Sequence, residues 1–163
     1  MVDIKKSPDG ASDLAFDLIE RMFFGYRDFV GLADEALART GYGRAHHRVL
    51  HFVDRNPGLT VGELLSILKV TKQGVARVLK TLVDDGQIKV EPGQRDRREK
   101  HLYTTEEGRR LARHLAALQT ARIDAALAAV GPEARPVVAD FLAGLVDEAE
   151  RGDVIGRIEG GRP

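Results

Sequence analysis

Apolar residues recur along most of this chain in steps of three and four positions, which is the period of an α-helix. The clearest run lies in the first quarter, at Phe16, Ile19, Phe23, Tyr26, Val30, Ala33 and Leu37. Together with capping residues, this period predicts helices over about 12–40, 44–54, from Thr60 to the Lys69-Val70 junction, 71–85, 105–130 and 135–150.

The period changes to two in the middle of the chain. Residues 87–91 alternate as Gln-Ile-Lys-Val-Glu, and a second short run, Lys-His-Leu-Tyr, occupies 100–103. Such runs are typical of strands, and Pro92-Gly93 opens a charged loop between them. The fold is therefore predicted to be mostly α with a small two- or three-stranded β-wing.

Two of the short helices are expected to form a helix-turn-helix. Glu63 follows Thr60 by three residues, which is a capping-box pattern, and Thr71 can cap the next helix after a tight connection at Lys69-Val70. Two short helices joined in this way are typical of the DNA-binding motif. Because the motif is short, an ordinary helical hairpin with solvated basic residues is the alternative interpretation.

The second of these helices would enter the major groove by its N-terminal end. Its apolar stripe leaves Lys72, Gln73, Arg77 and Lys80 pointing outward. Gln73 can offer a bidentate amide to adenine, whereas Lys72 or Arg77 can address guanine or a phosphate. Thr71 lies at the helix N-terminus, where backbone amides favour a phosphate.

The loop of the predicted ribbon is rich in arginine, since residues 94–100 are Gln-Arg-Asp-Arg-Arg-Glu-Lys. A narrow minor groove has an enhanced negative potential that attracts inserted arginines, here Arg95, Arg97 or Arg98. Asp96 lies two residues before Arg98 and can pair with its guanidinium and so orient it. A solvated charged turn is the alternative interpretation.

The net charge is zero, which at first argues against a nucleic-acid partner. The charges are unevenly distributed, however. Residues 60–115 contain 12 Lys and Arg against 8 Asp and Glu, whereas the rest of the chain contains 13 against 17. Because a phosphate backbone responds to local charge, the basic middle favours double-stranded DNA as a partner.

The stretch from Gly43 to Leu115 resembles the multiple antibiotic resistance regulator (MarR) family of bacterial transcription factors. The matching segments are 59–64 (Leu-Thr-Val-Gly-Glu-Leu), Val75, Leu82, Asp85-Gly86, the wing segment Asp96-Arg97-Arg98 and 105–109 (Thr-Glu-Glu-Gly-Arg). The wing segment followed at this distance by the helix start Thr-Glu-Glu-Gly is the most specific part. Lys69 departs from the family pattern, because glycine is common at this turn position.

The resemblance implies a winged helix-turn-helix regulator that binds a pseudo-palindromic operator as a homodimer, in many members as a repressor. Residues 43–104 would form the DNA-binding lobe, and residues 12–42 and 105–151 the helical dimerisation lobe. Arg98 would be the minor-groove arginine, and Asp96 its orienting partner. Many members respond to a small ligand between the two lobes, so an aromatic or carboxylate effector is expected.

Apolar side chains cover more than one face of the first predicted helix, at Met22, Phe23, Phe24, Tyr26 and Phe29. A helix that is apolar around much of its circumference needs partners on several sides. A second protomer would supply them, which favours a homodimer independently of the resemblance. Packing within one chain is the alternative.

The effector prediction falls on the first two helices, because in the family the second helix borders the effector cleft. The candidate residues are Tyr26, Arg27, Tyr42, His46, His47 and His51. Arg27 suits a carboxylate. His47 and His51 share a helix face, so a metal-responsive regulator is an alternative. No fixed spacing to further ligands accompanies them, and neither a metal nor a cofactor is expected.

Other classes of protein are disfavoured. The lack of cysteine excludes a disulfide framework and a cysteine-based redox sensor, and no phosphate loop or nucleophile motif indicates an enzyme. No apolar run reaches the roughly 20 residues of a membrane span, and the first ten residues lack the apolar core of a secretory signal, so a cytoplasmic protein is expected. A flexible arm over 1–11 and a flexible tail over 152–163 are expected. A winged-helix module that binds proteins without DNA is the alternative function.

Overall fold

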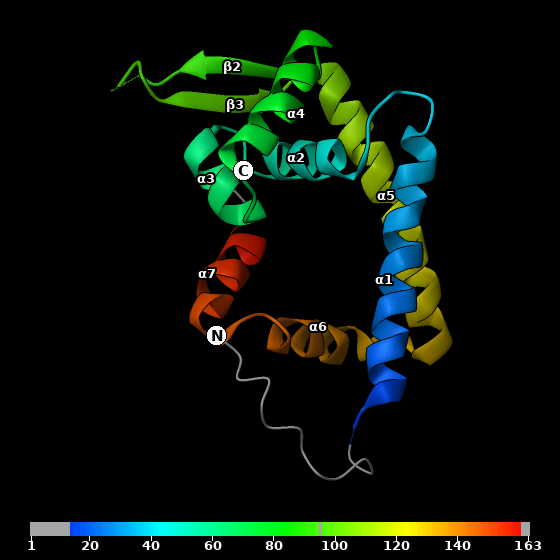
Figure 1. The fold of residues 1–163 in the computed structure, drawn as a ribbon. Helices are drawn as coiled ribbons and strands as arrows, with labels where there is room; N and C mark the ends of the chain where they lie inside the picture. The colour runs from blue at the N-terminus through cyan, green and yellow to red at the C-terminus, as the bar shows by residue number, and fades with distance from the viewer. Residues whose placement is uncertain (1–13, 95, 161–163) are drawn as a thin grey trace.

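Helices make up most of the fold. The computed structural model describes residues 14–94 and 96–160 (Figure 1). The helices are α1 (Phe16–Leu37), α2 (Arg44–Arg55), α3 (Val61–Leu68), α4 (Lys72–Asp84), α5 (Glu106–Val130), the 3₁₀ helix η1 (Pro132–Ala134), α6 (Arg135–Gly144) and α7 (Glu148–Glu159). The predicted mostly-α fold with a small wing is confirmed, and the helices up to α5 end within a few residues of their predicted bounds.

The wing is a three-stranded antiparallel sheet. It contains β1 (Leu59–Thr60), β2 (Ile88–Pro92) and β3 (Lys100–Thr104), in the spatial order β1-β3-β2. Ile88 lies opposite Thr104 and Pro92 opposite Lys100, so β2 and β3 form the predicted ribbon. Figure 1 shows this ribbon projecting away from the helices.

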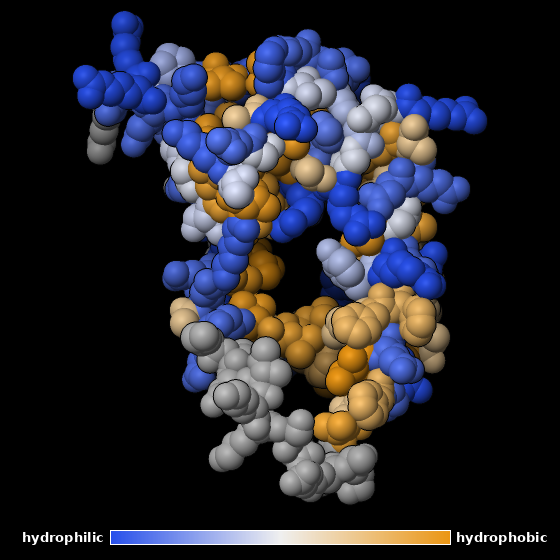
Figure 2. Space-filling model, viewed as in Figure 1, coloured by the Kyte–Doolittle hydropathy of each residue, from blue (hydrophilic) through white to orange (hydrophobic). Residues whose placement is uncertain are grey.

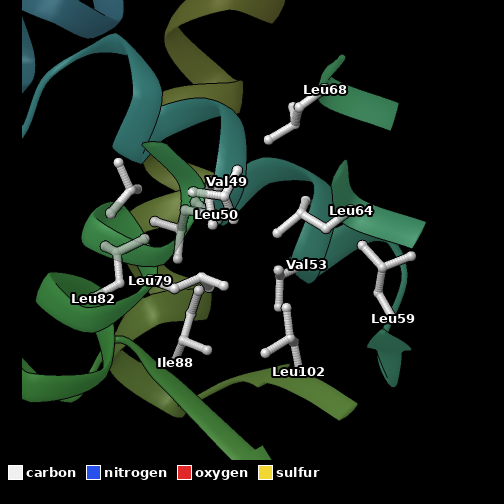
Figure 3. Close-up of a cluster of buried hydrophobic side chains, with 13 residues drawn as sticks. Val49, Leu50, Val53, Leu59, Leu64, Leu68, Leu79, Leu82, Ile88 and Leu102 are labelled. Carbon is white, nitrogen blue, oxygen red and sulfur yellow. The ribbon is translucent and has the colours of Figure 1, made fainter. Parts of the chain in front are cut away.

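The main hydrophobic core lies beneath the helix-turn-helix, where α2, α3, α4 and the sheet meet (Figure 3). Leu64 of α3, Leu82 of α4 and Leu102 of β3 are completely buried in it. Burial of each such leucine stabilises the fold by roughly 1.5–3 kcal/mol. This cluster therefore fixes α4 and the wing relative to α3.

A second, smaller cluster joins α1 to α5, which run side by side in Figure 1. Its buried members are Ala33 and Leu37 of α1 and Leu115 of α5. Tyr42, in the loop between α1 and α2, and Leu111 of α5 pack against both clusters. These two side chains therefore connect the α1–α5 pair with the main core beneath α3 and α4.

The prediction of one last helix over 135–150 followed by a flexible tail from Gly152 was wrong. The chain instead turns after α6 and forms α7, which continues to Glu159. The carboxylate of Asp147 accepts a hydrogen bond of 3.0 Å from the N–H of Ala149 and so starts a new helix. The guanidinium of Arg151 donates to the carbonyls of Gly144 and Val146, at 3.2 and 3.1 Å, and so holds the bend.

Helices α6 and α7 bring the end of the chain back toward its middle. Figure 1 shows α6 along the lower edge of the molecule and α7 rising from it toward α3. The expected arm over 1–11 lies outside the described residues, as do residues 161–163 of the expected tail. No helix among the described residues is long and apolar enough to cross a membrane.

Candidate DNA-binding interface

The first helix of the motif begins with the predicted capping box. The hydroxyl of Thr60 accepts a hydrogen bond of 3.2 Å from the N–H of Glu63, and the Thr60 N–H donates one of 2.8 Å to the Glu63 carboxylate. This exchange satisfies two backbone groups that the helix end would otherwise leave without partners. The start of α3 is therefore fixed by its own sequence.

The turn of the motif forces a lysine into an unusual backbone conformation. Lys69 has φ 51° and ψ 45°, which is the left-handed region that favours glycine. Among the described residues it is the only non-glycine with a positive φ. A side chain in this conformation costs roughly 1 kcal/mol. The packing on either side of the turn must therefore offset the free-energy cost of this backbone conformation.

Helix α4 presents a polar face above an apolar one. The hydroxyl of Thr71 caps it by accepting a hydrogen bond of 3.2 Å from the N–H of Gly74. The residues turned to the core are Val75, Val78, Leu79 and Leu82. The residues left exposed include the predicted contacts Thr71, Lys72, Gln73, Arg77 and Lys80. The structure thus places all five at the start and along the exposed face of α4. Lys80 forms an ion pair of 2.5 Å with Asp84.

The wing turn is organised by Asp96, but not as its sequence position suggested. Its carboxylate accepts a hydrogen bond of 2.9 Å from the backbone N–H of Arg98, and no ion pair joins it to the Arg98 guanidinium within the part of the chain that the structure describes. As in an Asx turn, the short Asp96 side chain accepts a hydrogen bond from the backbone N–H two residues later. It does not extend to the long, exposed guanidinium of Arg98. Arg97 and Arg98 remain exposed, and Arg95 lies outside the described residues.

Glycine is needed at the base of this turn. The N–H of Gly93 donates a hydrogen bond of 2.9 Å to the carbonyl of Glu99. A Cβ atom at position 93 would lie only 2.5 Å from the carbonyl oxygen of Asp96. The close approach of the two sides of the wing therefore depends on the missing side chain.

The helix start that carries the family resemblance anchors the wing. The hydroxyl of Thr105 accepts a hydrogen bond of 3.1 Å from the N–H of Gly108 and donates one of 2.6 Å to the carbonyl of Gly86. A Cβ atom at Gly108 would lie 1.9 Å from the carbonyl oxygen of Gln87. The Thr-Glu-Glu-Gly segment thus packs closely against the backbone of Gly86 and Gln87, which follow α4.

The end of α4 is tied to the loop between α1 and α2. The hydroxyl of Tyr42 donates a hydrogen bond of 2.8 Å to the carboxylate of Asp85, and its ring stacks on His46 with a centroid distance of 5.1 Å. Burial, followed by the hydrogen bond to Asp85, raises the pKa of Tyr42 to about 12. The phenol therefore stays protonated at neutral pH and can donate this hydrogen bond to Asp85.

The structure does not gather the candidate effector residues into one cavity. Tyr26 is 57% exposed on α1. Arg27 pairs with Asp28 at 2.7 Å, and its guanidinium lies 4.9 Å from the ring centre of Phe24. The ring of His46 accepts a hydrogen bond of 3.1 Å from the N–H of Gly43. Tyr26 and Arg27 therefore stand on a different element from the histidines.

The remaining histidines are adjacent on α2. The rings of His47 and His51 meet edge to face, with centroids 6.4 Å apart. Burial lowers the pKa of both, and in His51 the positive charge of Arg55 lowers it further. No group of three or more His, Cys, Asp or Glu side chains that could hold a metal occurs within residues 14–94 and 96–160.

A cavity of about 580 Å³ is lined by residues of α2, α3 and α7. Of the six candidate effector residues, only His51 lines it. The cavity was not predicted, because the tail expected over 152–163 would provide no wall for it. The sequence signal for α7 is the spacing of Val154, Ile155 and Ile158. Ile158 follows the other two by four and three positions, which is the helical period.

Three comparisons with known proteins agree with this geometry. The sequence profile of the MarR family matches residues 40–99. The chain is 49% identical over 133 residues to the HTH-type transcriptional regulator PetP of Rhodobacter capsulatus, covering 82% of this chain and 80% of that protein. Its fold is similar to that of Streptococcus pneumoniae FabT, solved in complex with DNA, with a TM-score of 0.71 and 20% identity over 80% of this chain and 93% of that chain.

A second solved structure gives the same picture. It is a putative MarR family transcriptional regulator from Listeria monocytogenes, complexed with a 26mer DNA, and its TM-score is 0.69 at 19% identity, over 89% of this chain and 96% of that chain. At such identities the two structures show the fold alone. The likeness to PetP extends to sequence over most of both chains, and it shows that this chain belongs to the MarR family, a family of transcription regulators rather than enzymes.

Proposed function

We propose that this protein is a homodimeric regulator that binds double-stranded DNA at a pseudo-palindromic operator and represses transcription until an effector releases it. The observation that carries the proposal is the shared exposure of the polar face of α4 and the arginines of the wing. Strongly hydrophilic side chains gather along the upper surface of the molecule in Figure 2, over the region where Figure 1 places α4 and the wing.

The two elements suit the two grooves of a duplex. Helix α4 exposes Lys72, Gln73 and Arg77 on one side, and these side chains can reach base edges in the major groove. Arg97 and Arg98 stand at the end of a projecting ribbon, where an arginine can enter a narrow minor groove. FabT and the Listeria monocytogenes regulator, whose folds are similar, were both solved in complex with DNA, which supports DNA as the partner of this chain.

The proposed homodimer is supported by the apolar surface of α1 and α6. Phe23 is 69% exposed and Val137 is 70% exposed, and Phe24 and Phe141 are also largely exposed. Figure 2 shows apolar residues in the lower half of the molecule. Apolar surface of this extent is typical of a protein interface. A second copy that covers these helices would place two copies of α4 on successive half-sites of one operator.

The test is to incubate the purified protein with sheared genomic DNA of its host and to sequence the fragments that it retains. We expect enrichment of a short palindrome, with less DNA retained by Arg77→Ala and unchanged retention by Arg113→Ala, which replaces an exposed arginine of α5. If the folded dimer enriches no sequence at low salt, the operator proposal fails and a protein-interaction module becomes the better explanation. Because the proposed target is chromosomal DNA, we place the protein in the bacterial cytoplasm.

The repressor role and the response to a ligand need a separate test. A reporter gene placed behind the recovered palindrome should be less active in cells that make the protein. Increased reporter activity would instead identify an activator. A change in DNA affinity with added Zn²⁺ that is abolished by His47→Ala would favour the metal-responsive alternative.

A further inference from the structure

His101 lies on the outer face of the wing sheet. It belongs to the central strand β3, opposite Thr60 of β1 and Glu91 of β2. The next residue, Leu102, is buried in the main core, and successive side chains of a strand point to opposite faces. His101 therefore points away from that core, and its side chain is 27% exposed. Its contacts on the outer face, rather than core packing, must account for its role.

One nitrogen of the ring holds the turn that leads into the helix-turn-helix. Nδ1 of His101 lies 2.8 Å from the carbonyl oxygen of Gly58, and because a carbonyl only accepts, Nδ1 must carry the hydrogen and donate it. Gly58 has φ 82°, and its N–H donates a hydrogen bond of 2.9 Å to the carbonyl of Leu102. Residue 58 is followed directly by β1 and α3. The histidine thus ties β3 to the entry of the helix-turn-helix.

The other nitrogen faces the turn that carries the exposed wing arginines. Nε2 of His101 lies 3.5 Å from the carboxylate of Glu99, and a Cβ atom at Gly93 would lie 3.1 Å from Nε2. The backbone of Glu99 closes this turn, because its N–H donates to the carbonyl of Asp96 at 3.1 Å and its carbonyl accepts from the N–H of Gly93 at 2.9 Å. The ring therefore lies between the turn of the wing and the turn before the helix-turn-helix.

The contact with Glu99 depends on the protonation of the ring. When the hydrogen of the neutral ring is on Nδ1, Nε2 of His101 has only a lone pair and faces a carboxylate that also only accepts. A second proton, on Nε2, makes this nitrogen a donor and gives the ring a positive charge. Only the protonated ring can therefore bind the Gly58 carbonyl and the Glu99 carboxylate at the same time.

The other charged groups on the elements around the ring are already engaged. On β2, the carboxylate of Glu91 is paired with Lys89 at 2.7 Å. The carboxylate of Glu63 on α3 accepts a hydrogen bond from the backbone of β1, and that of Asp96 accepts one from the backbone within the wing turn. Glu99 lies within ion-pair distance of the ring and is the carboxylate that a proton on Nε2 would engage.

We propose that His101 is a positioning residue for DNA binding, which holds the wing arginines relative to the helix-turn-helix by joining the Gly58 carbonyl to Glu99, and that protonation of its ring tightens this link. The inference rests on the proposed function, because the wing is there proposed to enter the minor groove. A wing that is already held in place loses less conformational freedom when its arginines bind, so its affinity is higher. Histidine changes charge between about pH 5 and 8, so DNA binding should strengthen as the pH falls through this range.

The contact with Gly58 is tested first in the DNA-free protein. Heteronuclear NMR of the imidazole nitrogens distinguishes the two neutral tautomers, and the signals of His101 are those missing from the spectrum of His101→Asn. At about pH 8 we expect the neutral ring to carry its hydrogen on Nδ1. A neutral ring with its hydrogen on Nε2 would overturn the inference without reference to DNA.

The effect on DNA is measured as the Kd for an A-tract duplex at about pH 8 and about pH 6, by fluorescence anisotropy, with circular dichroism to verify the fold at both values. The wild type should bind about two- to fivefold more tightly at the lower pH, as expected of a partly exposed ion pair. His101→Asn keeps a donor for the Gly58 carbonyl but cannot titrate, so it should lose this gain. His101→Leu loses both contacts and should bind more weakly than His101→Asn at both pH values. His114→Gln replaces an exposed histidine of α5 and should keep the gain.

A charge-neutral variant of Glu99 separates positioning from simple electrostatics. Glu99→Gln removes a negative charge beside the wing, which by itself should strengthen DNA binding equally at both pH values. If Glu99 acts through the protonated ring, Glu99→Gln should also lose the gain in affinity at the lower pH. Glu106→Gln removes an exposed carboxylate at the start of α5 and should keep that gain.

The outcomes distinguish this inference from the proposed function. If the wild type binds DNA equally well at both pH values, or if His101→Asn or Glu99→Gln keeps the full gain, the inference is overturned while the proposed function stands. If the folded wild type binds DNA at neither pH, the proposed function itself fails and the positioning role fails with it.

Discussion

The Tyr42 hydroxyl donates a hydrogen bond of 2.8 Å to the Asp85 carboxylate and so joins the loop after α1 to the end of α4. Tyr42 also packs against both hydrophobic clusters. The contact therefore lies where a shift of the α1–α5 pair would reach the helix proposed to enter the major groove. Its separation of 43 residues in the chain made it invisible to local sequence patterns.

Removing the Tyr42 hydroxyl should lower the stability of the fold. Tyr42→Phe keeps the ring that packs on His46 but leaves Asp85 without its donor, so we expect a loss of about 1 kcal/mol in the free energy of unfolding. Urea denaturation of Tyr42→Phe, Asp85→Asn and the double variant measures the coupling. A coupling energy of zero in this cycle would show that the two side chains act independently.

Replacing Gly108 should be among the most damaging single changes in the chain. Gly108→Ala places a methyl group 1.9 Å from the Gln87 carbonyl oxygen, and because that atom is backbone the contact cannot be relieved by a rotamer change. We expect a loss of about 2–3 kcal/mol in stability, measured by thermal or urea denaturation. Gly156→Ala in α7 is the control, since a Cβ there meets no atom within 4 Å, and it should be neutral or slightly stabilising. Equal stability of the two variants would contradict this account of the Thr-Glu-Glu-Gly segment.

Two substitutions in the wing should lower the affinity for DNA for different reasons. Arg98→Ala removes an exposed guanidinium and should reduce both affinity and any preference for a narrow minor groove. Asp96→Ala removes the acceptor of the Arg98 N–H and should reduce affinity by loosening the turn, with the charge of the arginine unchanged. Fluorescence anisotropy on A-tract and mixed-sequence duplexes separates these effects, with Arg113→Ala as the control. An Arg98→Ala variant that binds both duplexes like the wild type would exclude this arginine from the minor groove.

The sequence predicted those parts of the fold that local signals determine. The helical period located α1 to α5, and hydroxyl caps at Thr60, Thr71 and Thr105 set the beginnings of three helices. The glycine-like conformation expected of the turn is present at Lys69. The N-cap Thr71 and the four predicted contact residues on α4 are exposed because the apolar stripe of the helix is the side that is buried.

The remaining features depend on side-chain contacts that the hydrophobic period does not specify. Glycine-rich composition near the end of the chain suggested a tail, but the Asp147 cap and the Arg151 contacts with the α6 carbonyls produce a separate helix. The cavity beside α7 could not be foreseen without that helix. Asp96 contacts Arg98 through the backbone N–H rather than through the guanidinium, because short side chains satisfy local backbone donors first.

Two neighbours on α4 should separate affinity from sequence preference. If Arg77 neutralises a phosphate, Arg77→Ala should lower the slope of log affinity against log salt by about one unit. Gln73→Ala removes no charge, so it should leave the slope unchanged and relax the preference at one base pair. Titrations over a range of salt concentrations on cognate and altered operators give both quantities. An unchanged slope with lost sequence preference in Arg77→Ala would assign Arg77 to a base edge instead.

Two histidines of α2, the buried His47 and the partly buried His51, should make the protein less stable in acid. Burial is the largest cause that lowers the pKa of His47 and His51 below the ordinary 6.5, and Asp34 and Asp54 oppose it only in part. In the unfolded chain both rings take up protons near 6.5, whereas in the folded protein they do so only at lower pH. The unfolded state therefore binds more protons below about pH 6.5, and stability falls as the pH decreases through that value. Urea denaturation between about pH 5 and pH 7 should show this slope, and it should be smaller in the double variant His47→Gln/His51→Gln. His114→Gln replaces an exposed histidine of α5 and should leave the slope as it is. If the double variant and the wild type lose stability in parallel over this range, these two histidines are not the source of the acid sensitivity.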